Sequence, residues 1–201
     1  MSRVNIAVAG AGVIGRAHIA VIAQSSQCRL SAIADPSEAA QALAQTHGVP
    51  WFATLDELLA TASPDGVILA TPNALHVPQA LQCIAAGVPV LVEKPIAHTV
   101  ADAQKLVQAT QAHQAKVLIG HHRAHSPIMR EAKAVIDDGR LGQLVSVVGS
   151  AMFYKPDDYF TQAPWRREVG GGPILINLIH EIHNLRMLCG EIVEVQAMTS
   201  N

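Results

Sequence analysis

The feature that most constrains the fold of this chain is a glycine-rich segment near its N-terminus, Gly10-Ala11-Gly12-Val13-Ile14-Gly15. An apolar run, residues 4–9, precedes it, and a helix-compatible run, residues 16–24, follows it. Between a strand and a helix, the first glycine permits a tight turn, the second lets a pyrophosphate approach the backbone, and the third lets the helix pack closely. We therefore expect a phosphate-binding turn at the N-terminus of the first helix.

An acidic residue, Asp35, stands at the end of the next apolar run, residues 30–34. A carboxylate at this place accepts hydrogen bonds from the ribose hydroxyls of NAD(H) and repels the 2′-phosphate of NADP(H). The next three residues, Pro36, Ser37 and Glu38, include no arginine to hold that phosphate. The sequence therefore predicts NAD as the cofactor, in preference to NADP.

The composition is that of a globular protein with a sizeable core, because half of the 201 residues are hydrophobic and 15% are charged. A net charge of −2 without a basic run argues against nucleic acid or an anionic membrane as a partner. We find no signal peptide and no apolar run near the ~20 residues of a membrane span. Scattered cysteines without CxxC spacing, Cys28, Cys83 and Cys189, indicate buried free thiols in a reducing compartment. These features predict a cytoplasmic protein.

Strand and helix patterns alternate up to about residue 121. Ser37, Thr54 and Thr99 are positioned to start helices, with Glu57 completing a capping box. Later strands are expected at residues 66–70, 88–93 and 116–120, and a helix at residues 76–86. This alternation predicts an α/β fold with a doubly wound parallel sheet over residues 1–121.

The pattern changes in residues 122–201, which we expect to form part of a second, α+β domain. We predict helices at residues 128–138 and 173–189, strands at residues 144–154 and 192–198, and a polar loop at residues 155–172.

In a doubly wound sheet, the ligand lies beyond the carboxyl ends of the strands. This rule selects three further segments: Thr71-Pro72-Asn73, Glu93-Lys94-Pro95 and His121-His122-Arg123. Lys94 is the strongest candidate for a site role, because Pro95 restricts its backbone and Glu93 can hold its ammonium group. The alternative is an ordinary surface lysine.

The helix predicted at residues 173–189 carries a second candidate. Asn177, His180, Glu181 and Asn184 share an arc of about 100° on an otherwise apolar helix, which is typical of a wall facing a cleft. A solvated face or a satisfied core histidine is the alternative. His180 and His183 have a spacing compatible with a metal, but no carboxylate or cysteine pattern completes a site, so we predict none.

These motifs together resemble the Gfo/Idh/MocA oxidoreductases over essentially the whole chain. The resemblance also includes His76, the Trp165-Arg166 pair, and Gly170-Gly171-Gly172 leading to His180. It implies an N-terminal Rossmann domain followed by an α+β domain with a largely antiparallel open sheet. It also implies a homo-oligomer formed through the second domain.

The resemblance implies hydride transfer between NAD and a secondary alcohol or carbonyl of a sugar, a cyclic polyol or a related compound. Lys94 and His180 would be the catalytic pair. A histidine is suited to remove the hydroxyl proton during oxidation and to return it during reduction. A lysine ammonium would stabilise negative charge on the substrate oxygen.

The predicted cofactor contacts come from the glycine turn, the strand ends and the residues near them: Gly10, Gly12, Val13, Ile14, Gly15, Asp35, Thr71, Pro72, Asn73, His76, Glu93, Lys94 and Arg123. The predicted substrate contacts are Lys94, Trp165, Arg166, Asn177 and His180.

Two positions depart from the family pattern. Ile176 stands where many members have an aspartate four residues before the histidine, and His183 where they often have one three residues after it. The chain is also shorter than most members, so we expect an incomplete second domain. Two alternatives therefore stay open: a dinucleotide-binding sensor or regulatory protein without turnover, and a fragment that needs a partner chain.

Overall fold

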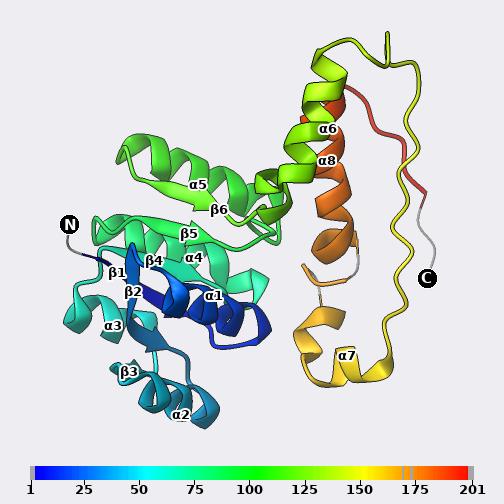
Figure 1. Ribbon diagram of the computed structural model, residues 1–201. Coiled ribbons are helices and arrows are strands. Elements are labelled where there is room, and N and C mark those ends of the chain that lie inside the picture. Colours follow the sequence, from blue (N-terminus) through cyan, green and yellow to red (C-terminus); the bar gives the residue numbers. More distant parts are fainter. Residues whose placement is uncertain (1–2, 169, 173, 199–201) are drawn as a thin grey trace. The chain divides into compact units, whose positions relative to one another are not determined.

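The computed structural model describes residues 3–168, 170–172 and 174–198 of the chain (Figure 1). The chain forms two compact units. Met1–Gly120 together with Pro164–Gly171 form the first, which we call the sheet unit. His121–Ala163 together with Gly172–Asn201 form the second, which we call the helical unit.

The sheet unit is built on one parallel sheet of six strands, in the order β3-β2-β1-β4-β5-β6. The strands are β1 (Val4–Ala9), β2 (Cys28–Ala34), β3 (Trp51–Phe52), β4 (Gly66–Leu69), β5 (Val90–Val92) and β6 (Val117–Ile119). The order reverses between β1 and β4, which is the switch point where doubly wound sheets bind ligands. The predicted doubly wound fold is confirmed.

Helices cover both faces of this sheet: α1 (Val13–Gln24), α2 (Glu38–His47), α3 (Leu55–Ala62), α4 (Asn73–Ala85) and α5 (Val100–Ala112). Ile19 of α1 and Ala44 of α2 pack in one buried cluster with Val8 and Ile33. The remaining helices, α3, α4 and α5, contribute to the other buried cluster. Strands covered on both faces are expected to be mostly apolar, and the buried ends of β1 and β2, Ala7–Ala9 and Ala32–Ala34, are.

The helix starts follow the predicted caps. The Ser37 hydroxyl accepts a hydrogen bond from the Ala40 N–H, and the Thr99 hydroxyl accepts one from the Asp102 N–H. Thr54 and Glu57 form the reciprocal capping box at the start of α3. These contacts satisfy N–H groups that the first turn of a helix cannot pair internally.

The helical unit contains η1 (His122–His125), α6 (Pro127–Asp137), α7 (Asp157–Thr161), a π-helical segment η3 (Ile174–Leu178) and α8 (Ile179–Cys189). The predicted helix over residues 173–189 is thus divided into a π-helical and an α-helical part, and Pro173 lies outside the described residues. The segment predicted as a polar loop, residues 155–172, includes α7 and η2 (Pro164–Arg167).

The two strands predicted beyond residue 121 are not found. Residues 144–154 and 191–198 carry no strand, and the described residues of the helical unit form no sheet. Val145, Val148 and Val193 are 92%, 94% and 99% exposed. An apolar extended segment becomes a strand only when a neighbour pairs with its backbone, and neither segment has such a neighbour among the described residues.

The prediction of three buried thiols is correct only for Cys83. All three cysteines are free, but Cys28 is half-buried and Cys189 is exposed at the end of α8. Burial raises the pKa of the Cys83 thiol to about 12, so this thiol stays protonated. Of the helices in the described ranges, none is long and apolar enough to cross a membrane.

The capping box of α3 provides a test of the local structure. Replacing Thr54 with Ala removes the acceptor for the Glu57 N–H, so the free energy of unfolding should fall by about 1 kcal/mol. Thr46→Ala is the control, because its hydroxyl only donates to the Ala42 carbonyl within α2, and it should change stability by less than ~0.5 kcal/mol. Urea denaturation measures both, and equal effects would contradict the capping role.

Candidate active site

The glycine turn brings the backbone of α1 into direct contact with the end of β1. A Cβ atom on Gly15 would lie 1.8 Å from the Gly10 carbonyl oxygen. A Cβ atom on Gly10, whose φ is +88°, would lie 2.6 Å from the Ala70 carbonyl carbon and oxygen. The first and third glycines are therefore required by the packing of the turn.

The second glycine has a different environment. A Cβ atom on Gly12 would meet nothing within 4 Å, although Gly12 is the N-cap of α1. No side chain caps the helix there, and the Val13 and Ile14 side chains are exposed. Open space and a helix N-terminus without a side-chain cap fit the pyrophosphate of a dinucleotide.

Asp35 is held beside this turn by three hydrogen bonds. Its Oδ2 accepts one from the Ala11 N–H at 2.8 Å, and its Oδ1 accepts two from Ser37, from the N–H at 2.9 Å and from the hydroxyl at 2.6 Å. An ionised carboxylate offers about four acceptor sites. Asp35 therefore keeps acceptor capacity for a ribose hydroxyl while its orientation is fixed.

The loop after β4 is in contact with the side chain of His76. This side chain is buried, with Nδ1 2.7 Å from the Pro95 carbonyl oxygen and Nε2 2.9 Å from the Thr71 carbonyl oxygen. Burial lowers the pKa of His76 despite the opposing effect of the two carbonyls. The ring thus links the loop after β4 to the loop after β5, which carries Lys94.

Glu93 is a buried carboxylate directly next to Lys94. Its Oε1 lies 2.8 Å from Nε2 of His18 on α1, and its Oε2 accepts a hydrogen bond from the Lys94 N–H at 3.2 Å. Gly120 lies against it, since a Cβ atom there would come within 2.8 Å of Oε1. Burial by itself would raise the pKa of Glu93, but the hydrogen bond and charge of His18, with the N–H and charge of Lys94, lower it.

Sequence reasoning missed His18. Its contact with Glu93 joins residues 75 positions apart, which no local pattern reveals. One signal could have revealed it: His18 follows the third glycine, Gly15, by three residues, and the start of this helix lies at the carboxyl ends of the strands. The sequence-based prediction pairs Glu93 with the Lys94 ammonium group, and the charge of Lys94 does contribute to the lowered pKa of Glu93, which also accepts a hydrogen bond from the Lys94 backbone.

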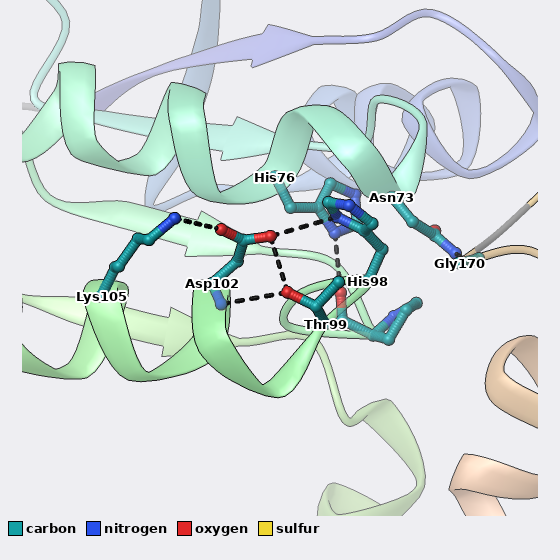
Figure 2. A network of polar contacts seen from close by, with 8 residues as sticks. Asn73, His76, His98, Thr99, Asp102, Lys105 and Gly170 are labelled. Atoms are coloured by element: carbon teal, nitrogen blue, oxygen red, sulfur yellow. Dashed lines mark hydrogen bonds and ion pairs between the residues drawn. The ribbon is translucent and has the colours of Figure 1, made fainter.

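Trp165 and Arg166 belong to the sheet unit, although they follow most of the helical unit in the sequence. Both lie in η2, and the Arg166 guanidinium is 5.7 Å from the centre of the Trp165 ring. The Asn73 side chain, on the first turn of α4, donates a hydrogen bond to the Gly170 carbonyl at 2.8 Å (Figure 2). Asn73 thereby connects the loop after β4 with Gly170, the first glycine of the Gly170-Gly171-Gly172 run.

His180 lies in the helical unit, whereas Lys94 lies in the sheet unit. The His180 side chain is 7% exposed, and its ring meets the His122 ring edge-on with centroids 5.0 Å apart. His121 and His183 stack at 4.3 Å. Four of the histidines that the sequence analysis singled out therefore form two ring pairs.

Arg123, predicted as a cofactor contact, pairs with α8. Its Nη1 donates to both carboxylate oxygens of Glu181, at 2.7 and 2.9 Å, and Asn184 donates to Glu181 at 3.1 Å. Two members of the predicted polar stripe, Glu181 and Asn184, are thus bonded to each other, and Glu181 is also bonded to Arg123.

The predicted alignment of Asn177 with His180 assumed a continuous α-helix, and this assumption is wrong. Asn177 lies in π-helical η3, where the rotation per residue is smaller than 100°. It lines a pocket within the helical unit together with Ala151, Phe153, Ile174 and Leu178. Across residues 3–168, 170–172 and 174–198 we find no cluster of His, Cys, Asp and Glu suited to a metal.

Glu93 makes the stability of the sheet unit depend on pH. Because its folded-state pKa is lowered, its ionised form stabilises the fold above the ordinary glutamate value of about 4.3. This contribution is lost as the pH falls through the folded-state pKa. Glu93→Gln should therefore show a shallower loss of unfolding free energy than the wild type between pH 5 and pH 3, and His18→Ala an intermediate one, in urea titrations. Parallel curves for all three proteins would contradict this role of Glu93.

Comparison with known proteins matches residues 4–121 to an oxidoreductase family model described as an NAD-binding Rossmann fold. Residues 129–201 match the GFO/IDH/MocA C-terminal domain. The rhizopine catabolism protein MocA of Rhizobium meliloti is 30% identical over 95% of this chain and 59% of its own length. Inositol 2-dehydrogenase of the same species is 31% identical over 94% of this chain and 56% of its own length.

Among solved structures, the WlbA dehydrogenase of Bordetella pertussis, crystallised with NADH and UDP-GlcNAcA, superposes with a TM-score of 0.89. It is 29% identical, and the match covers 94% of this chain and 59% of that one. The chain thus spans somewhat more than half the length of the relatives it matches. The glycine turn, the sheet topology and both family matches agree, and the chain belongs to the Gfo/Idh/MocA family of oxidoreductases.

Proposed function

We propose that this chain is an NAD-dependent dehydrogenase that acts on a secondary alcohol of a sugar, a cyclic polyol or a related hydroxylated compound, or on the corresponding carbonyl. The observation that carries the proposal is the glycine turn, in which Gly12 faces open space at the N-terminus of α1 while Asp35 is held beside it. This arrangement has the shape and the polarity that a dinucleotide requires.

The cofactor-binding residues act through backbone and charge. The N–H groups of the first turn of α1, from Val13 onward, face the pyrophosphate, and Gly12 lets it approach. Asp35 accepts hydrogen bonds from the ribose hydroxyls, and its negative charge disfavours a 2′-phosphate, which makes NAD the preferred form. When bound, NAD supplies the hydride acceptor, and NADH the hydride donor.

Lys94 and His180 are the proposed catalytic pair. Lys94 donates a hydrogen bond to the substrate oxygen and stabilises the negative charge that develops there. His180 accepts the hydroxyl proton during oxidation and returns it during reduction. Neither Ile176 nor His183 supplies a carboxylate to this histidine, so the pair works without the aspartates that many family members have.

The remaining site residues are assigned by their places in the fold. Thr71, Pro72, Asn73, His76 and Glu93 line or support the cofactor side at the ends of β4 and β5. Trp165, Arg166 and Asn177 are proposed substrate contacts, and Arg123 a cofactor contact. The similarity to an inositol 2-dehydrogenase supports a polyol as substrate.

We also propose a cytoplasmic location and a homo-oligomer formed through residues 122–201, the proposed substrate domain, whereas residues 1–121 form the NAD-binding domain. Exposed apolar side chains in the helical unit, such as Val145, Val148 and Val193, support self-association because burying them would be favourable. The net charge of −2 gives no support to a nucleic acid or a membrane as a partner.

Two glycine variants separate cofactor binding from folding. Gly12→Ala places a methyl group in open space, so stability should change by less than ~1 kcal/mol, while NADH binding weakens by about tenfold or more. Gly15→Ala forces a Cβ against the Gly10 carbonyl and should lower the free energy of unfolding by about 3 kcal/mol. NADH fluorescence titration and urea denaturation measure the two effects. Unchanged NADH affinity in Gly12→Ala would argue against the proposed site.

Turnover tests the catalytic pair. With NAD and a panel of cyclic polyols and sugars, followed by NADH absorbance, Lys94→Ala and His180→Ala should each lower kcat by about 100-fold or more. Lys116→Ala and His47→Ala are matched controls on exposed positions and should keep wild-type rates. If both catalytic variants turn over substrate at the wild-type rate, the assignment is wrong. If NADH binds but no member of the panel is oxidised, the result favours a dinucleotide-binding protein without turnover.

A further inference from the structure

The described residues 164–168 and 170–171, which we call the strap, belong to the sheet unit. Two backbone hydrogen bonds shape it: the Glu168 N–H donates to the Trp165 carbonyl at 3.1 Å, and the Gly171 N–H donates to the Glu168 carbonyl at 2.9 Å. A Cβ atom on Gly171 would lie 2.6 Å from the Arg166 carbonyl oxygen and 2.7 Å from that of Trp165. The strap therefore folds back on itself closely enough to require glycine at residue 171.

One anchor of the strap is Asn73. Its amide donates to the Gly170 carbonyl at 2.8 Å, and the residue is only 5% exposed (Figure 2). Asn73 begins α4 at the carboxyl end of β4, next to the switch point of the sheet. A buried amide bonded to a distant backbone carbonyl fixes the position of that backbone, since breaking the bond would leave both groups without a partner.

The second anchor is His98, in the loop between β5 and α5. Gly170 has a φ of +86°, and a Cβ atom on it would lie 2.3 Å from the His98 Cβ and 3.1 Å from its Cγ. The imidazole Nδ1 lies 3.8 Å from Asp102, which also accepts hydrogen bonds from Thr99 at 2.7 Å and Lys105 at 2.8 Å (Figure 2). His98 thus lies within ion-pair distance of the first turn of α5, and its side chain leaves space only for glycine at residue 170.

We propose that Asn73, His98 and Gly170 are positioning residues that seat the strap on the sheet unit and thereby place Trp165 and Arg166 beside the loops after β4 and β5. The loop after β5 is the one that carries Lys94, so the seat joins the strap to two site loops. This inference rests on the proposed function, because it gives Trp165 and Arg166 their role at the cofactor and substrate. It also explains why residues 170 and 171 are glycines, for which the hydride-transfer chemistry gives no reason.

Two variants test the seat, which consists of Asn73, His98 and Gly170, and each disturbs a different contact. Asn73→Asp keeps the shape of the side chain and suits a helix N-terminus, but it puts an acceptor against the Gly170 carbonyl. Gly170→Ala brings a Cβ into His98 and requires the left-handed backbone that alanine disfavours. Gly149→Ala is the control, because a Cβ there meets nothing within 4 Å.

Limited trypsin digestion of the full chain measures the seat directly, through the initial rate of cleavage after Arg166 and Arg167. Both seat variants should be cleaved there about fivefold faster than the wild type and Gly149→Ala, with cleavage at Arg130 and Lys133 of α6 unchanged. Circular dichroism confirms that α4 and the other helices are retained. Equal cleavage after Arg166 in the wild type and in both seat variants would overturn the proposal.

NADH keeps this test separate from the proposed function. If the strap borders the cofactor, NADH should slow cleavage after Arg166 in the wild type by at least about threefold, and less so in Gly170→Ala. Faster cleavage of the seat variants without NADH supports the seat even if the wild type proves unable to bind NADH, which would instead refute the proposed function. NADH binding to the wild type that leaves cleavage after Arg166 unprotected would refute the role of the strap at the cofactor.

Discussion

The sheet unit depends on the close approach of α1 to β1 at Gly10 and Gly15. The Gly10 carbonyl occupies the space where a Cβ of residue 15 would lie, and Gly10 itself lies against the backbone of Ala70. This contact positions the N-terminus of α1 next to the switch point between β1 and β4. Because the turn can form only with hydrogen at these positions, the packing that stabilises the fold also creates the anion site.

Around that turn, the buried side chains of His76 and Glu93 and the half-buried side chain of Asp35 hold loops in place. His76 links the carbonyls of Thr71 and Pro95, Glu93 bonds to His18 and to the Lys94 backbone, and Asp35 receives the Ala11 N–H. Each would be costly to bury without a partner. Their shared effect is that the loops after β2, β4 and β5 are fixed before any ligand arrives, which lowers the entropic cost of binding.

The sequence predicted the sheet unit well because its signals are local. Ser37, Thr54 and Thr99 cap helices from within three residues, and short apolar runs flanked by turns and alternating with helices favour buried strands. The contacts of the site are not local: His18 meets Glu93, and Asn73 meets Gly170, across 75 and 97 positions. Residues 144–154 have the apolar pattern of a strand. Whether they form one depends on a second segment that pairs with their backbone, and their own sequence does not reveal that segment. The π-helical segment before α8 likewise leaves no mark in a periodicity calculated at 100° per residue.

The glycine turn and Asp35 together form the proposed NAD site of this chain. Calorimetric titration of the unmodified chain with NADH and with NADPH tests it most directly. We expect saturable binding of one NADH per chain, with NADPH bound at least about tenfold more weakly because of the Asp35 carboxylate. Saturable binding of NADPH that is as tight as that of NADH, or no binding of either, would contradict it.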